Sequence, residues 1–157
     1  MIEQVPHIES LEISLGTPHH GWLPVRIVLG DYQLFADASN VLNDPISELI
    51  ELTMFVKKMS SSFRRVCFWL EPAGYAIDVK HTGPQRILIT ILSDKDFFPP
   101  MNNAHMKEEY CCSVSQYTLY KALIESLNQW LLSNSKNVVE HWAPETVDYK
   151  GEIQRLE

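Results

Sequence analysis

Two adjacent histidines, His19 and His20, stand just before Gly21 and Trp22 and are the first residues along the chain that could do chemistry. Neutral imidazole binds metal ions and moves protons near neutral pH, so this pair raises a metal-binding or acid–base role. Adjacent histidines on a turn seldom converge on one ion, and no HxxxH spacing or nearby carboxylate pair completes a ligand set. The sequence therefore favours a surface turn on which Trp22 packs, and it predicts no metal and no cofactor.

A second group, Trp69, Glu71 and Asp78, falls on neighbouring predicted strands, on the side away from the expected core. Tryptophan is enriched among residues that anchor protein interfaces, and acidic neighbours select basic partners. We therefore expect these three residues, with Trp22 and His20, to bind a protein partner. Two alternatives stay open: a half-exposed sheet face covered by a loop or by the C-terminal tail, and a glycosidase-like carboxylate pair, for which the spacing gives no support.

Familiar motifs for a nucleophile or a phosphate-binding loop do not occur, since GxSxG, GxxxxGK and GxGxxG are all absent from the chain. The 3 cysteines, Cys67, Cys111 and Cys112, form no CxxC pair and have no histidine at zinc-finger spacing. We expect them to be reduced core residues, and catalysis through a phosphate-binding loop is disfavoured.

Alternating apolar residues predict two antiparallel meanders that would position these side chains. The first spans 11–38, with inward-facing Leu11, Ile13, Leu15, Val25, Ile27, Leu29, Tyr32, Leu34 and Ala36. The second spans 66–91, with inward-facing Val66, Phe68, Leu70, Tyr75, Ile77, Val79, Ile87, Ile89 and Ile91. Gly30 and Asp31 mark a hairpin turn. Pro24 cannot donate a ladder hydrogen bond, so it predicts an edge position or a strand that begins after it.

Two helices are expected, each with a start signal. Asp44 predicts the N-cap of a helix over 45–59, whose first residue is a proline. Ser113 and Gln116 have the spacing of a capping box and predict a second helix that ends near residue 132. Both helices carry a broad apolar stripe, which indicates that they lie on a sheet.

These elements predict an α+β fold of order βββ-α-βββ(β)-α, an antiparallel sheet built from two meanders with helices packed on one face. The loop over 94–108 is long enough to be functional or mobile. We expect residues 1–157 to form a single domain, with an ordered core over about 10–132 and a loosely held tail over 133–157.

The charge balance bears on partners. The chain has 13 lysines and arginines against 20 aspartates and glutamates, a formal net charge of -7, which repels nucleic acid and suits a basic protein partner. It lacks the basic start and apolar run of a signal peptide, and no apolar stretch approaches the roughly 20 residues that cross a bilayer. We therefore expect a soluble cytoplasmic protein with no nucleic-acid or membrane partner.

Several short runs suggest a relationship: HGWLPV from His20, the Gly30-Asp31 turn, the NDP helix start at Asn43, and WLEPxGY from Trp69. They resemble those of a group of small bacterial proteins of unassigned function, some of which are similar to immunity proteins of contact-dependent or polymorphic toxin systems. The likeness covers roughly residues 10–92, and most matched residues belong to turns and caps. It implies a non-catalytic partner that masks a toxin, and it supplies no binding residues.

We therefore expect a non-enzymatic binding protein, more specifically an immunity protein, that covers a basic toxin with an acidic and aromatic sheet face. One alternative is a small-molecule or enzymatic site under the loop 94–108, with His20 or His105 as its ionisable group. The other is a structural homo-oligomer formed through an edge at Pro24. An exposed face around Trp69 would support the first hypothesis.

Overall fold

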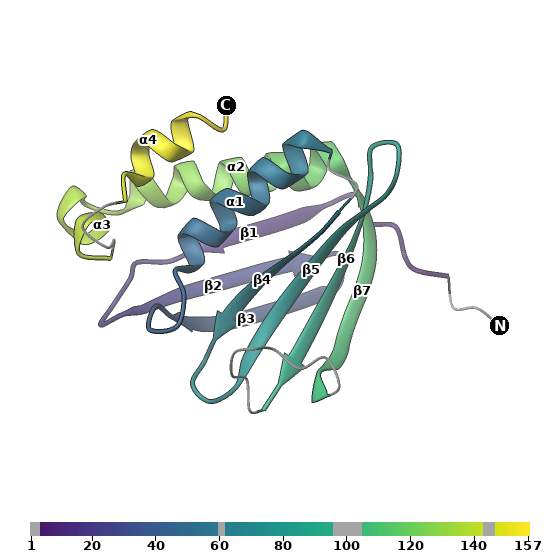
Figure 1. The fold of residues 1–157 in the computed structure, drawn as a ribbon, viewed down its shortest axis with the longest axis horizontal. Coiled ribbons are helices and arrows are strands. Elements are labelled where there is room, and N and C mark those ends of the chain that lie inside the picture. The colour runs from purple at the N-terminus through teal and green to yellow at the C-terminus, as the bar shows by residue number, and fades with distance from the viewer. Residues whose placement is uncertain (1–3, 60–61, 96–104, 143–146) are drawn as a thin grey trace.

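The computed structural model describes residues 4–59, 62–95, 105–142 and 147–157 and has an α+β architecture of two antiparallel sheets with helices (Figure 1). The first sheet has the order β1 (Leu11–Leu15), β2 (Trp22–Leu29) and β3 (Tyr32–Ser39). The second has the order β4 (Phe63–Trp69), β5 (Gly74–Gly83), β6 (Arg86–Asp94) and β7 (Lys107–Ser115). The helices are α1 (Pro45–Lys58), α2 (Gln116–Ser133), α3 (Lys136–Trp142) and α4 (Tyr149–Gln154).

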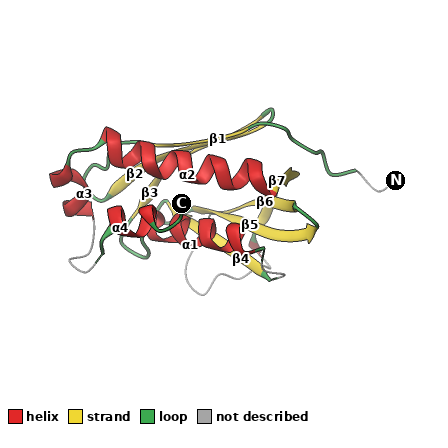
Figure 2. Cartoon of the chain, turned by 90° about the horizontal axis from the view of Figure 1, so that it is seen from above, coloured by secondary structure: helices red, strands yellow, loops and turns green. Residues whose placement is uncertain are grey.

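One side of each sheet is apolar, as the alternation predicts. In the four-stranded sheet, Val66, Phe68, Ile77, Val79, Ile87, Ile89 and Ile91 are all buried in one core cluster. Helix α2 packs against β1 and helix α1 against β4, and both helices lie on the same side of the sheets (Figures 1 and 2). The predicted α+β fold, with two meanders and helices on one side, is confirmed. Among the described residues, no helix is both long and apolar enough to cross a membrane.

Neither alternative predicted from Pro24 is correct, because β2 is the middle strand of its sheet and begins at Trp22, before the proline. The strand tolerates proline because Pro24 lies opposite Gly16, one residue beyond the end of β1. Its carbonyl accepts a hydrogen bond from the Gly16 N–H at 2.8 Å, and its missing N–H removes no bond within β1. Pro24 therefore offers no free strand edge through which a homo-oligomer could form.

The N-cap residue of α1 is the predicted one, whereas that of α2 is not. Asp44 caps α1, and its Oδ1 accepts a hydrogen bond from the Ile46 N–H at 3.1 Å. At α2 the cap is Ser115, whose Oγ accepts from the Thr118 N–H at 3.1 Å. The capping box predicted at Ser113 is wrong because β7 continues through that residue.

The N-terminal segment joins the two sheets. The Ile8 N–H donates to the Ser113 carbonyl at 2.9 Å, and the Ser113 N–H donates to the Pro6 carbonyl at 2.8 Å, so this segment pairs with the edge of β7. The chain then continues into β1 of the other sheet. One extended stretch thus contributes to both sheets, as corner strands do in packed-sheet folds.

The C-terminal part differs from the loosely held tail expected over 133–157. The Trp142 indole N–H donates to Asp44 Oδ1 at 3.1 Å, and the Tyr149 hydroxyl donates to Asp44 Oδ2. Ile153 and Leu156 are buried in the core. A loosely held tail is therefore wrong for residues 136–142 and 147–157, because the α1 N-cap binds two aromatic side chains that lie about 100 residues further along the chain.

Candidate protein-binding surfaces

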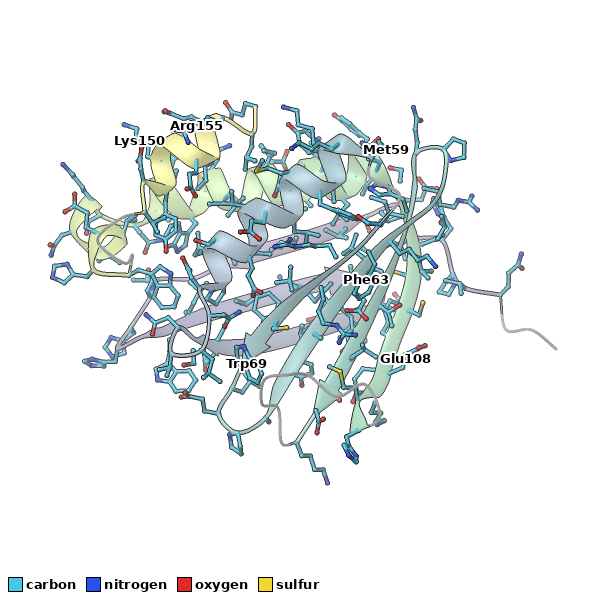
Figure 3. The ribbon with its side chains drawn as sticks, viewed as in Figure 1. Met59, Phe63, Trp69, Glu108, Lys150 and Arg155 are labelled. Carbon is cyan, nitrogen blue, oxygen red and sulfur yellow. The ribbon has the colours of Figure 1, made fainter. Side chains whose placement is uncertain are left out.

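The outer side of the four-stranded sheet carries the residues that alternate with the core positions. The strand register aligns them in rows across the sheet: Phe63, Lys80 and Leu88; then Arg65, Asp78 and Thr90; then Cys67, Ala76 and Leu92. Trp69, the last residue of β4, and Gly74, the first residue of β5, form the next pair. Figure 3 labels Phe63 and Trp69, which begin and end that strand.

The Trp69 end of this sheet face is closed. Trp69 is only 4% exposed and forms a small apolar cluster with Cys67 and Ala76, against which Leu92 and Met106 pack. The prediction that Trp69 is a water-exposed anchor is wrong, because its side chain is buried in this cluster, against which Leu92 of β6 and Met106, just before β7, pack. Its contribution is therefore to packing, and the docking surface predicted around it is not available there.

Asp78 is half-buried and bound within the chain. Its carboxylate accepts two hydrogen bonds from Arg65, from Nε at 2.5 Å and from Nη2 at 2.7 Å, which is bidentate geometry. The Asp78 carboxylate raises the pKa of Arg65. Glu71 is exposed, but it lies in the turn after β4 and not on the sheet beside Asp78. The expected row of free carboxylates next to Trp69 is therefore wrong.

Trp22 and His20 belong to the other sheet and its first turn. His20 is exposed, and its ring centroid lies 4.0 Å from that of His19. The two histidines face α3 across a hollow of about 200 Å³ that His141 also lines. Within the described ranges, no three His, Cys, Asp or Glu side chains could together hold a metal ion. The structure thus divides the five predicted site residues between two sheets.

The alternative site under the loop 94–108 lies for the most part at residues 96–104, outside the described residues. His105, its second proposed ionisable group, is exposed at the start of the segment that leads into β7.

The buried thiols are held in their protonated form. Burial raises the pKa of Cys67 to about 12, and the Glu48 carboxylate adds to that rise. Burial likewise raises the pKa of Cys112 to about 12, with a further contribution from Cys111. Because a thiolate is the reactive species, neither Cys67 nor Cys112 is a nucleophile near neutral pH.

Glu48 is hydrogen-bonded to the backbone at the edge of β4. Its carboxylate accepts a hydrogen bond from the Cys67 N–H at 3.3 Å and another from the Asn43 side-chain amide. The same amide donates to the Cys67 carbonyl at 2.9 Å. Glu48 in the first turn of α1 and Asn43 just before its N-cap thus satisfy the N–H and the carbonyl of Cys67 on an edge strand, which blocks pairing with another chain at that residue. Burial raises the pKa of Glu48.

The outer side of the three-stranded sheet is open, and we call it the Phe35 face. It comprises Glu12, Ser14, Trp22, Pro24, Arg26, Phe35 and Asp37. Phe35 is 65% exposed, and the Arg26 guanidinium carbon lies 5.6 Å from its ring centroid. Arg26 Nη1 also lies 3.4 Å from Glu12 Oε1. Apart from Trp22, sequence reasoning missed this face, although Phe35 stands among the polar alternates of β3, between Gln33 and Asp37.

A second open region, the Phe63 groove, begins at the end of the four-stranded sheet's outer side opposite Trp69 and extends along β6 as far as Leu92 and Met106. It consists of two adjoining hollows of about 310 and 630 Å³ that share Leu88. Phe63 borders one hollow and is 52% exposed. The N-terminal segment from Gln4 to His7 borders the other. Two open surfaces, one on each sheet, are thus the candidate sites.

Comparison of the chain with protein-family models, with curated proteins and with solved structures found no match. The function is therefore inferred from the two surfaces themselves.

Proposed function

We propose that this protein is a protein-binding module whose recognition surface is the Phe35 face. The observation that carries the proposal is Phe35, a large apolar side chain that is 65% exposed between Arg26 and Asp37 on a regular sheet surface. Exposed aromatic side chains with charged neighbours are typical of interface anchors, because they bury much area at little cost in conformational entropy. A hollow of about 420 Å³ beside Phe35 provides room for a side chain of the partner.

The charges around Phe35 favour a basic partner. Asp37 is exposed and, within the described part of the chain, forms no ion pair. Glu12 shares its charge with Arg26, and exposed Asp31 lies in the turn that leads into β3. The net charge of the whole chain, -7, has the same sign. Acidic groups around an apolar anchor would attract a basic protein and select its orientation.

The likeness to immunity proteins adds a class of partner to this proposal, namely a basic toxin. In that case the protein would act by covering a surface of the toxin, and no chemical step would be required of it. Growth of cells that express a toxin encoded by the adjoining gene would be restored by co-expression of this protein. Restoration that is unchanged by both Phe35→Ala and Asp37→Lys would contradict the assignment of the Phe35 face.

The direct experiment is affinity capture from the native cell, followed by binding of the purified partner. Phe35→Ala and Asp37→Lys should each weaken binding by about tenfold or more, because one removes the anchor and the other reverses the charge. Tyr117→Ala is the matched control, since it removes an exposed aromatic side chain from α2, outside both open surfaces. Equal affinity of the wild type and both Phe35-face variants would refute the proposal.

A further inference from the structure

The Phe63 groove has a basic end that the rest of the chain leaves unneutralised. Lys80 and Arg86 are exposed, and neither forms an ion pair with any residue that the structure describes. Arg65 is bound to Asp78, so that pair adds no net charge. Glu108, opposite Leu92, lines the same hollow as Lys80 but at its far end, so the excess of positive charge is confined to the end formed by Lys80 and Arg86. A local excess of positive charge in a chain of net charge -7 marks this end for an anionic ligand.

The spacing of the groove residues suits an extended chain. Lys80 lies directly across from Leu88, and Arg86 precedes Leu88 by two residues on the same side of β6. On β4, the strand that flanks β5 on its other edge, Phe63 lies directly across from Lys80. Facing side chains on neighbouring strands are roughly 5 Å apart, diagonal ones roughly 7–8 Å. Alternate side chains of an extended peptide are separated by about 6.6 Å, so they can meet Arg86, Lys80 and Phe63 in turn.

We propose that the Phe63 groove binds an acidic, extended protein segment. Two carboxylates at alternate positions would meet Arg86 and Lys80, and an apolar residue at the next alternate position would pack on Phe63 and Leu88. Hydrogen-bonded charge pairs and a buried apolar anchor are the usual elements of peptide recognition in a groove. This surface lies on the other sheet from the Phe35 face, so the inference does not rest on the proposed function.

The test uses a fluorescein-labelled heptapeptide in which serines alternate with glutamate, glutamate and phenylalanine. Fluorescence anisotropy should show saturable binding to the full-length protein that weakens with added salt. Replacement of both glutamates by glutamine, and the variants Lys80→Glu and Arg86→Glu, should each weaken binding by roughly fivefold or more. Lys150→Glu on α4 is the matched control, because it makes the same charge change on the helical side of the molecule (Figure 3).

Several results would overturn this proposal. They are the absence of saturable binding, equal affinity for the glutamate and glutamine peptides, and equal affinity of Lys80→Glu, Arg86→Glu and Lys150→Glu. Tighter binding of labelled oligothymidylate, lost in Phe63→Ala, would assign the groove to single-stranded nucleic acid instead. Each variant is checked for an unchanged unfolding midpoint; if Lys80→Glu or Arg86→Glu unfolds early, the glutamine substitution at the same position replaces it.

Discussion

The outer faces of the two sheets contain the same kinds of residue and differ in whether those residues are available. On the four-stranded sheet, Trp69 is 4% exposed and Asp78 is bound by Arg65. On the three-stranded sheet, Phe35 is 65% exposed and Asp37 is exposed. An aromatic residue and a carboxylate on the outer side of a strand therefore do not by themselves define a recognition surface. Their neighbours on the same face decide whether a partner can reach them.

The largest contrast should appear in stability. Trp69→Ala should lower the free energy of unfolding by about 3–5 kcal/mol, because it leaves a cavity among Cys67, Ala76 and Leu92. Phe35→Ala should change it by no more than about 0.5 kcal/mol, because an exposed side chain loses little on truncation. Urea denaturation followed by circular dichroism measures both. Similar losses in the two variants would mean that the two faces are equally covered.

The ion pairs Arg65–Asp78 and Arg26–Glu12 should also differ in their contribution to stability, by a smaller amount. Asp78→Asn should destabilise the fold by about 1–3 kcal/mol, since it leaves the half-buried Arg65 guanidinium with an incomplete partner. Glu12→Gln, which removes the exposed partner of Arg26, should have no measurable effect, because exposed ion pairs contribute little. Denaturation in low and high salt checks this, and an equal cost for both substitutions would contradict the difference in burial.

A still smaller effect on stability is expected from Glu48, the α1 residue whose carboxylate accepts a hydrogen bond from the Cys67 N–H at the edge of β4. Its pKa is raised above the ordinary value of 4.5 by burial, so the folded state binds this proton more tightly than the unfolded state does. The stabilisation from this group is thus complete below pH 4.5 and is lost as the pH rises through the folded pKa. Glu48→Gln should therefore gain stability relative to the wild type between pH 4 and pH 7.

Unfolding free energies measured at both pH values for the wild type and Glu48→Gln check this prediction, with Glu12→Gln as an exposed control. A difference between Glu48→Gln and the wild type that stays constant from pH 4 to pH 7 would show that Glu48 is not buried as described.

The sequence was sufficient for the α+β fold, because period-two alternation and the Asp44 cap are local signals that depend on few neighbours. The sequence was insufficient to predict which residues on the outer faces of the two sheets are accessible. Met106, 37 positions after Trp69, packs against the cluster of Cys67, Trp69 and Ala76, and no local pattern in the sequence indicates that packing. The pairing of Arg65 with Asp78 could have been found, since the turn after β4 fixes the hairpin register and places these two residues opposite each other.

The C-terminal part illustrates a second limit. The sparse apolar residues of α3 and α4 gave little periodicity, and a loosely held tail was the natural prediction. Trp142 and Tyr149 both donate hydrogen bonds to Asp44, whose place before Pro45 identifies it as the α1 cap but does not indicate these distant partners. A carboxylate at a helix N-cap can accept several bonds, so it can also hold distant segments.

Hydroxyl-radical footprinting of the protein, alone and bound to its captured partner, tests the central claim most directly. We predict strong modification of Phe35 in the free protein, protection of Phe35 in the complex, and little modification of Trp69 in either state. Strong modification of Trp69 in the free protein, or a complex in which Phe35 stays fully reactive, would contradict the assignment of the Phe35 face as the recognition surface.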